Sequence, residues 1–262
     1  MKIGIAGCSG RMGQLLVRES AARGYQLIAT VEPHSPMTGQ DIGTLCGLEP
    51  LGAVTSSEPA ELFKADVVID FTIPAATRRH AELARAHRIP LVIGTTGLDA
   101  ETKKAIAAAS EVAPVLVAAN FSRGVNLLAL LVEEAARRLG LEADIEIVEM
   151  HHRAKVDAPS GTALALGEAA ARGRQQKLAE VAIQGRDGHT GPRPTGSIGF
   201  AALRGGSVVG DHQVIFALDG ERLELGHRSE NRVIYAKGAI AAANWLVSQP
   251  PGLYGMQDFL KA

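Results

Sequence analysis

A glycine-rich turn near the start of the chain constrains the fold more than any other feature of the sequence. The segment GCSGRMG, residues 7–13, follows the short apolar run KIGIA and precedes a run with helical spacing, GQLLVRESAARG. Glycines at its first, fourth and last positions permit a tight turn, a close approach of the backbone to a pyrophosphate, and close packing of a helix on a strand. The free N–H groups at the start of that helix then face the phosphates. The turn therefore predicts the first strand–helix unit of a dinucleotide-binding fold, and a ligand-free turn is the alternative.

Short apolar strands alternate with longer amphipathic helices through the first 120 residues. We predict strands at 2–7, 26–32, 65–72, 90–96 and 114–120, and helices at 13–24, 74–88 and 99–112. Unbroken apolar strands joined by helices are typical of a parallel sheet covered on both faces. The sequence thus predicts an α/β fold whose N-terminal part is a Rossmann-type doubly wound parallel sheet.

The pattern changes after residue 120. We predict a helix at 125–140, a strand at 144–152, a helix at 160–174, a long loop at 187–199, and consecutive strands within 200–230. Asp219-Gly220 is typical of a hairpin turn, so we expect a C-terminal α+β domain with a mostly antiparallel sheet. The helix predicted at 232–249 has no sheet of its own and is expected to pack on the first domain. The predicted domains are residues 1–121 with 232–262 for dinucleotide binding, and residues 122–231 for substrate binding and tetramerisation.

The acidic residue Glu32 supports a dinucleotide ligand. It lies 19 residues after Gly13, at the end of the second predicted strand, close to the spacing of about 20 expected for an acid that bonds the ribose hydroxyls. Pro33 follows it, and no adjacent arginine is present to bind a 2′-phosphate, although Arg11 can pair with a phosphate. The sequence therefore favours NADH as the cofactor, with NADPH as the alternative.

A second cluster of reactive side chains begins at the end of the strand predicted at 144–152. His151 and His152 are adjacent, and adjacent strand residues point to opposite faces, so they cannot easily bind one metal ion. No cysteine or carboxylate completes a usual zinc spacing, and we predict no metal site. Lys155 follows, and then Ser160-Gly161-Thr162 at a helix start, where free N–H groups favour an anion. This pattern favours hydride delivery to an anionic, electron-poor substrate, with a protonated side chain neutralising the charge that develops.

Several motifs occur in order along nearly the whole chain: GCSGRMG, GTTG, AANFSRGVN, HHRAKVDAPSGTA, GRDGHTGPRPTGSIGF and GERLELGHRSENR. Together they resemble the 4-hydroxy-tetrahydrodipicolinate reductases, also called dihydrodipicolinate reductases, of bacterial and plant lysine biosynthesis. The resemblance implies reduction of a cyclic imine dicarboxylate, in the diaminopimelate pathway, with NADH or NADPH. It also implies a homotetramer built through the C-terminal domains.

The resemblance also implies roles for individual residues. It makes His151 the proton donor, His152 a substrate ligand and Lys155 a catalytic and substrate-binding lysine. Gly161 and Thr162 match residues that hold a substrate carboxylate, with Ser160 beside them, and Arg232 matches a further substrate-side arginine. The cofactor residues that it implies are Gly7, Cys8, Ser9, Gly10, Arg11, Met12, Glu32, Gly94, Thr95, Thr96, Ala118, Ala119, Asn120 and Phe121. Pro33 departs from the arginine that many NADPH-using members have there.

Bulk properties exclude several other classes of protein. The formal net charge of −1 and the aromatic content of 4% argue against nucleic acid as a partner, and no apolar run has transmembrane length. Two cysteines give no disulfide framework, and the sequence shows no signal or transit segment, so we expect a cytoplasmic protein. Two alternatives stay open: another two-domain nicotinamide-dependent reductase or amino-acid dehydrogenase, and a non-catalytic NAD-binding regulatory module.

Overall fold

Contacts along the chain separate two units in the computed structural model, which describes residues 1–261. Unit 1 comprises Met1–Ser122 and the segment from Val233 onwards, and unit 2 comprises Arg123–Arg232. No helix within the described residues is both long enough and apolar enough to cross a membrane.

Unit 1 is built on a six-stranded sheet in which every pairing is parallel, in the order β11-β5-β4-β3-β1-β2. Its strands are β1 (Lys2–Ala6), β2 (Gln26–Ala29), β3 (Val67–Asp70), β4 (Leu91–Ile93), β5 (Pro114–Val117) and β11 (Gly252–Tyr254). Its helices are α1 (Arg11–Ala21), α2 (Ile42–Leu45), the 3₁₀ helix η1 (Pro59–Lys64), α3 (Pro74–His87), α4 (Ala100–Ser110), α8 (Val233–Leu246) and α9 (Met256–Lys261).

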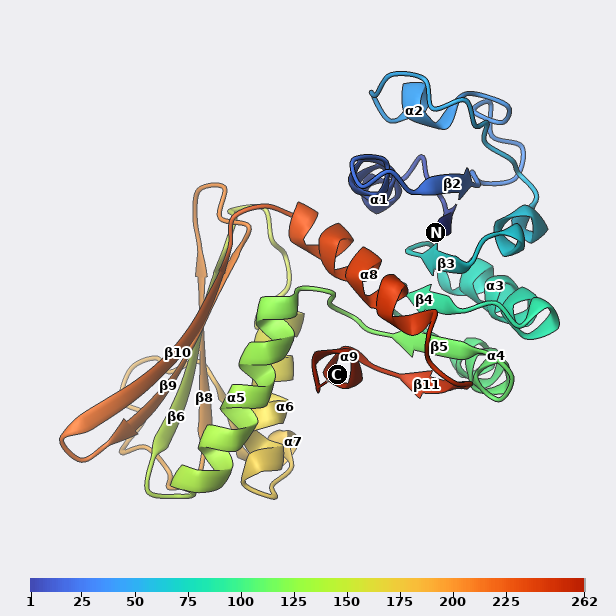
Figure 1. The fold of residues 1–262 in the computed structure, drawn as a ribbon. Coiled ribbons are helices and arrows are strands. Elements are labelled where there is room, and N and C mark those ends of the chain that lie inside the picture. Colours follow the sequence, from blue (N-terminus) through green and yellow to red (C-terminus); the bar gives the residue numbers. More distant parts are fainter. Residues whose placement is uncertain (262) are drawn as a thin grey trace. The chain divides into compact units, whose positions relative to one another are not determined.

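Helices cover both faces of this sheet, as the strand–helix alternation predicts. α1 and α8 lie on one face, and α3 and α4 lie on the other (Figure 1). Strand side chains such as Ile3, Ile5 and Val67 are fully buried between these layers. The Rossmann-type prediction for the first part of the chain is therefore confirmed.

The last helical segment belongs to unit 1 because α8 packs against α1 and against β3, β4 and β5. Gly238 allows this close packing, since a Cβ atom there would lie 1.8 Å from the carbonyl oxygen of Phe121. β11 then adds a sixth strand beside β5, an element that the sequence analysis did not predict.

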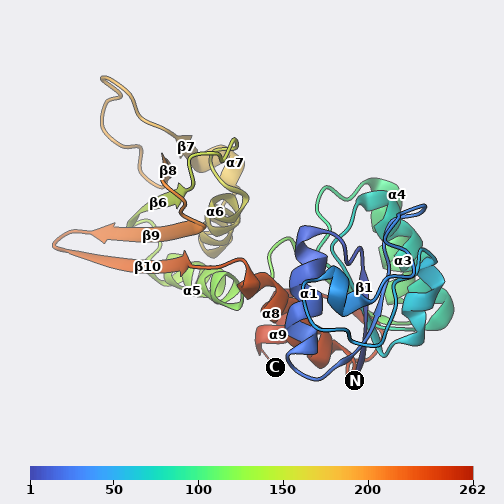
Figure 2. The ribbon, with the colours of Figure 1, turned by 90° about the horizontal axis from the view of Figure 1, so that it is seen from above.

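Unit 2 contains a five-stranded sheet with two helices on one face. Its elements are α5 (Arg123–Leu139), β6 (Asp144–His151), α6 (Gly161–Gly173), α7 (Leu178–Val181), β7 (Ala182–Gln184), β8 (Ile198–Arg204), β9 (Gly210–Leu218) and β10 (Glu221–Ser229). α5 and α6 lie on the same side of the sheet (Figure 1). A long loop, residues 185–197, joins β7 to β8 (Figure 2), close to the predicted loop.

The sheet of unit 2 is mixed, whereas the sequence analysis expected a mostly antiparallel one. Its order is β10-β9-β6-β8-β7, in which β10–β9 and β9–β6 are antiparallel and β6–β8 and β8–β7 are parallel. The parallel half arises because two connections, the helical segment α6–α7 and then the loop at 185–197, each carry the chain back to the same end of the sheet. The predicted hairpin is present, with Gly220 at φ +85° between β9 and β10.

Gly13 provides a test of the packing between the glycine turn and α1. A Cβ atom at this position would lie 2.2 Å from the carbonyl oxygen of Gly7 and 2.7 Å from Cα of Cys8, and neither backbone atom can move away easily. We expect Gly13→Ala to lower the free energy of unfolding by about 1–3 kcal/mol, measured by urea denaturation. Gly10→Ala is the matched control, because its Cβ would lie 3.3 Å from the same oxygen. Equal stability of the two variants would contradict this account.

Candidate active site

A cavity of about 680 Å³ lies at the carboxyl ends of β1, β2 and β3 in unit 1. The strand order reverses between β1 and β3, and ligands of open α/β sheets bind at such a switch point. The lining comes from the turn after β1, the end of β2, the segment after β3 and the first turns of α3. It includes Gly7, Ser9, Gly10, Thr30, Glu32, Phe71, Thr72, Arg79 and His80.

The glycine turn presents its backbone to this cavity. Gly7 has φ +65°, a conformation that favours glycine, and the N–H of Gly10 donates to the carbonyl oxygen of Gly7 at 3.0 Å. The side chain of Cys8 is buried in the core, where burial and the neighbouring Cys46 raise its pKa to about 12. Met12 packs against the same core. The turn therefore presents backbone and Ser9, rather than a reactive thiol, to the cavity.

Glu32 follows β2 and lies on the lining of the cavity. The hydroxyl of Ser9 donates to Oε2 of Glu32 at 3.0 Å, which links the glycine turn to the end of the second strand. A carboxylate is thus fixed beside the glycine turn, in the arrangement that dinucleotide-binding folds use for ribose hydroxyls and phosphates.

The other predicted cofactor residues follow β4 and β5. Within residues 1–261, Gly94–Thr96 and Ala118–Phe121 do not line this cavity. The hydroxyl of Thr95 accepts from the N–H of Thr72 at 3.1 Å and contacts Thr77 at 2.8 Å, so it joins the loops after β3 and β4. Phe121 is buried in the core of unit 1.

A buried acid–histidine pair at the end of β3 was not predicted. Asp70 is completely buried, and its Oδ2 lies 2.9 Å from Nδ1 of His80. Burial alone would raise the pKa of Asp70, but the contacts with His80 and Thr72 outweigh burial and lower it. This pair fixes α3 against the end of β3, and thereby the wall of the cavity that His80 lines.

In unit 2, β6 places the predicted proton donor on the face that α5 and α6 cover. Along this strand Ile145, Ile147, Glu149 and His151 are buried and alternate with partly exposed residues. His151 Nδ1 lies 2.6 Å from Oε2 of Glu149. His152, the first residue after β6, is partly exposed, so the two histidines have different surroundings.

The start of α6 is joined to this pair through Glu149 and Ser160. The N–H of Ser160 donates to Oε1 of Glu149 at 3.1 Å. The hydroxyl of Ser160 accepts from the N–H of Ala163 at 3.1 Å and caps the helix, which confirms the predicted cap. The same hydroxyl lies 3.0 Å from Nε2 of His212. Ser160 is therefore buried as a structural link, and its predicted contact with substrate stays a prediction.

The remaining predicted substrate residues lie on the loop before α6, in its first turn, and at the end of unit 2. Lys155 is partly buried, and its Nζ lies 2.7 Å from Oδ1 of Asp157. This contact lowers the pKa of Asp157. Gly161 is exposed, and a Cβ atom there would meet open space, while Thr162 follows it in the first turn of α6. Arg232 is exposed and is the last residue of unit 2.

His212 on β9 is a second histidine of this site. Its ring packs edge-on against His151, with centroids 5.1 Å apart. Burial, and then the nearby charge of His151, lower the pKa of His212 to about 4. His212 is therefore neutral near pH 7, next to the predicted proton donor. Within residues 1–261, no group of three or more histidine, cysteine or acidic residues is arranged to hold a metal ion.

Three residues of this site were missed by the sequence analysis: Glu149, Arg204 and His212. A signal was present for Glu149, because an acid two residues before His151 must share its face of the strand. No comparable signal marked Arg204 or His212, since their proximity depends on the pairing of β8 and β9 with β6.

The fold and the glycine turn of unit 1 are those of a dinucleotide-dependent oxidoreductase, with a second unit that carries an acid–histidine pair. Comparisons with known sequences identify the family. The family model described as "Dihydrodipicolinate reductase, N-terminus" matches residues 1–121, and "Dihydrodipicolinate reductase, C-terminus" matches residues 124–260. The chain belongs to the dihydrodipicolinate reductase family.

Curated relatives and a solved structure agree with this family. The 4-hydroxy-tetrahydrodipicolinate reductase of Sinorhizobium fredii is 54% identical, covering 99% of this chain and 97% of the relative. That of Brucella abortus is 53% identical, covering 99% and 98%. A dipicolinate-bound dihydrodipicolinate reductase from Paenisporosarcina sp. TG-14 has a TM-score of 0.74 at 26% identity, covering 98% of each chain.

The buried neutral state of His212 predicts how stability depends on pH. Its pKa is about 4 in the folded chain and about 6.5 when unfolded, so between these values the unfolded chain binds a proton that the folded chain does not. Stability from this group is complete above pH 6.5 and is lost as the pH falls towards 4. Between pH 7 and pH 5 we expect a loss of about 2 kcal/mol.

Urea denaturation at both pH values, with wild type and His212→Gln, measures this contribution. We expect the variant, whose amide can still bond Ser160, to show a smaller loss of stability between pH 7 and pH 5. The same pH dependence in both proteins would show that His212 is not the group responsible.

Proposed function

We propose that this chain reduces 4-hydroxy-tetrahydrodipicolinate to tetrahydrodipicolinate with a nicotinamide dinucleotide, in the diaminopimelate route to lysine. The observation that carries the proposal is the pairing of His151 with a buried carboxylate beside the start of α6. Support comes from relatives of that name that are more than half identical over nearly the whole chain. We expect this biosynthetic reaction to take place in the cytoplasm.

Unit 1 is the proposed dinucleotide-binding part. The residues present fit such a ligand, because the turn at Gly7–Gly10 leaves backbone facing a cavity of about 680 Å³ and Glu32 stands at the ribose position. NADH is the favoured cofactor, since Glu32 would repel a 2′-phosphate and Pro33 follows it, with NADPH as the alternative. A bound nicotinamide would supply the hydride.

Unit 2 is the proposed substrate-binding part. The first turn of α6, at Gly161 and Thr162, presents helix N–H groups and a partial positive charge to one carboxylate of the substrate. Gly161 leaves open space above this turn. His152 and Lys155 on the preceding loop, and Arg232, add donors and positive charge for a dianion. The dipicolinate bound in the Paenisporosarcina structure is a small dicarboxylate of this kind.

His151 is the proposed acid. The 4-hydroxyl group of the substrate and a hydrogen from a neighbouring ring carbon leave together as water, which gives a conjugated imine ring. This ring then gains one hydride and one proton. Negative charge develops on the ring as hydride arrives, and His151 supplies the proton that neutralises it. Lys155 has two roles open to it: assistance at the imine nitrogen, or an electrostatic influence on His151.

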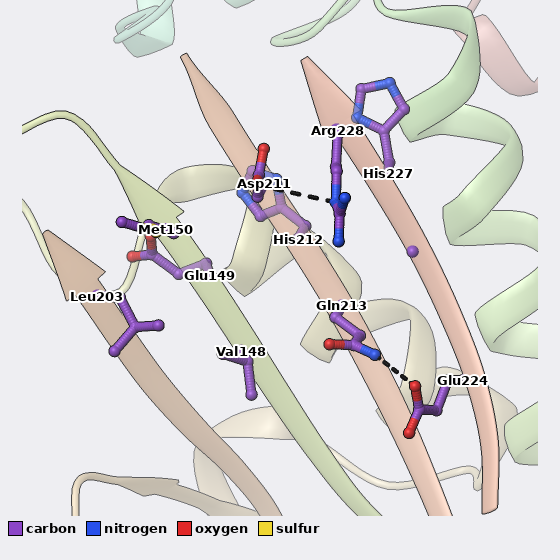
Figure 3. Close-up of a pocket in the computed structure, with 11 residues that line it drawn as sticks. Val148, Glu149, Met150, Leu203, Asp211, His212, Gln213, Glu224, His227 and Arg228 are labelled. Carbon is purple, nitrogen blue, oxygen red and sulfur yellow. Dashed lines mark hydrogen bonds and ion pairs between the residues drawn. The ribbon is translucent and has the colours of Figure 1, made fainter. Parts of the chain in front are cut away.

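Self-association through unit 2 is proposed from the uncovered face of its sheet. Val148, Met150 and Leu203 line a hollow of about 480 Å³ there (Figure 3), and Leu203 is 51% exposed. Figure 3 also shows the polar pairs Asp211–Arg228 and Gln213–Glu224 beside these apolar groups. We propose that this face joins copies into a homotetramer, a state that sedimentation equilibrium measures directly.

A coupled assay tests the reaction. Pyruvate, aspartate semialdehyde and the upstream synthase supply the substrate, and oxidation of NADH and of NADPH is followed separately at 340 nm, the usual absorbance of reduced nicotinamide. We expect both to be oxidised, NADH with the higher kcat/KM. Absence of oxidation of either cofactor would contradict the proposed function.

Substitution of His151 and of Lys155 tests their roles in the same assay. We expect His151→Ala and Lys155→Ala each to lower kcat by about two to four orders of magnitude if both residues act in proton transfer. NADH affinity, measured by fluorescence titration, should be unchanged. Unaltered kcat values would remove these residues from the mechanism and leave the fold intact.

A further inference from the structure

Glu149 is the most deeply buried carboxylate of unit 2, and no step of the proposed reaction uses it. Its side chain is 1% exposed, yet both of its oxygens are bonded. Arg204 donates to them through Nη1 at 2.7 Å and Nη2 at 2.8 Å. Ser160 donates its N–H to Oε1 and His151 approaches Oε2. Four contacts from three segments of unit 2 therefore converge on one carboxylate.

These contacts determine which nitrogen of His151 carries a hydrogen. Burial alone would raise the pKa of Glu149, but the bonds from Arg204 and His151 outweigh it and lower the pKa. An ionised carboxylate can only accept hydrogen bonds. Nδ1 of His151 must therefore donate to Glu149, and Nε2 is the ring nitrogen left for proton exchange.

The surroundings of Nε2 support this assignment. A Cβ atom on Gly210 would lie 3.0 Å from Nε2 of His151, so the absence of a side chain on β9 gives this nitrogen room. The ionisable groups that face His151 within unit 2 are Glu149 on β6, Arg204 on β8 and His212 on β9. The charges of His227 and Lys155 also act on His212, each more weakly than the charge of His151.

Arg204 connects the same carboxylate to the loop that carries Lys155. Its Nη2 also donates to the carbonyl oxygen of Asp157 at 2.7 Å, and Asp157 pairs with Lys155. The Glu149–Arg204 pair thus holds both the proposed acid and the loop with the proposed lysine, from the side of the sheet that the helices cover.

We propose that Glu149, held in place by Arg204, is a positioning residue that fixes the ring orientation and tautomer of His151, so that Nε2 is the proton-transferring nitrogen. The kinetic part of this inference rests on the proposed function. Glu149 itself does not touch the substrate; it acts through His151, as carboxylates do for histidines in other enzymes.

Glu149→Gln tests the proposal because glutamine keeps the size of the side chain and removes its charge. We expect kcat to fall about 100-fold or more, KM for the substrate to change less than about threefold, and NADH affinity to stay constant. Loss of the carboxylate also destabilises the imidazolium form of His151. The high-pH limb of the kcat/KM profile should therefore move to lower pH, and Glu149→Asp should restore part of kcat.

Glu146→Gln is the matched control. Glu146 lies on the same strand and also accepts from two arginines, Arg186 and Arg193, but it contacts no histidine among the described residues. We expect this control to keep the wild-type kcat and the wild-type pH profile. An equal fall of kcat in both variants with an unmoved limb would show a structural effect only and overturn the proposal.

Nitrogen-15 NMR of the histidine-labelled full chain tests the tautomer without any turnover. With His151→Asn to assign the signal, neutral His151 should carry its proton on Nδ1 in wild type and show a tautomer mixture in Glu149→Gln. A wild-type proton on Nε2 would overturn the proposal. If the chain fails to reduce the substrate, the proposed function fails, and the NMR result still decides the role of Glu149.

Discussion

The ion pair between Glu149 and Arg204 is the interaction on which the arrangement of unit 2 around the proposed acid depends. A carboxylate that is 1% exposed is strongly destabilised unless donors and a countercharge surround it. Here those donors are supplied by β8, by the start of α6 and by His151. Satisfying one buried charge therefore requires three segments of unit 2 to meet in one arrangement, and this arrangement is the one that orders the proposed acid.

A second buried carboxylate does comparable work in unit 1. Asp70 at the end of β3 is paired with His80 on α3, and the hydroxyls of Thr72 and Thr95 donate to its Oδ1, which ties it to the loops after β3 and β4. Both units thus place a buried acid at the carboxyl end of a strand and pair it with a histidine, Asp70 with His80 in unit 1 and Glu149 with His151 in unit 2. In each unit, the hydrogen bonds to the buried carboxylate hold the neighbouring segments of the chain in place.

The sequence predicted those parts of the molecule that depend on local pattern. Strand–helix alternation predicted the doubly wound sheet, glycine spacing located the turn between β1 and α1, and Ser160 marked the start of α6. The parallel half of the second sheet was not predicted, because β7 has only three residues and pairing depends on distant segments. Arg204 and His212 were missed for the same reason, since 53 and 61 residues of chain separate them from His151. The family resemblance added residue roles that pattern alone does not provide.

The ionisation state of Glu149 is the most direct test, because the position and the tautomer of His151 both depend on it. Carbon-13 NMR of glutamate-labelled protein, with the Glu149 side-chain signal assigned through Glu149→Gln, follows the carboxyl group as the pH is lowered from 7. The structure predicts that this carboxyl stays ionised at least down to the usual glutamate range of about pH 4. Protonation close to pH 7 would make Glu149 a hydrogen-bond donor, and that result would contradict the account of how His151 is held.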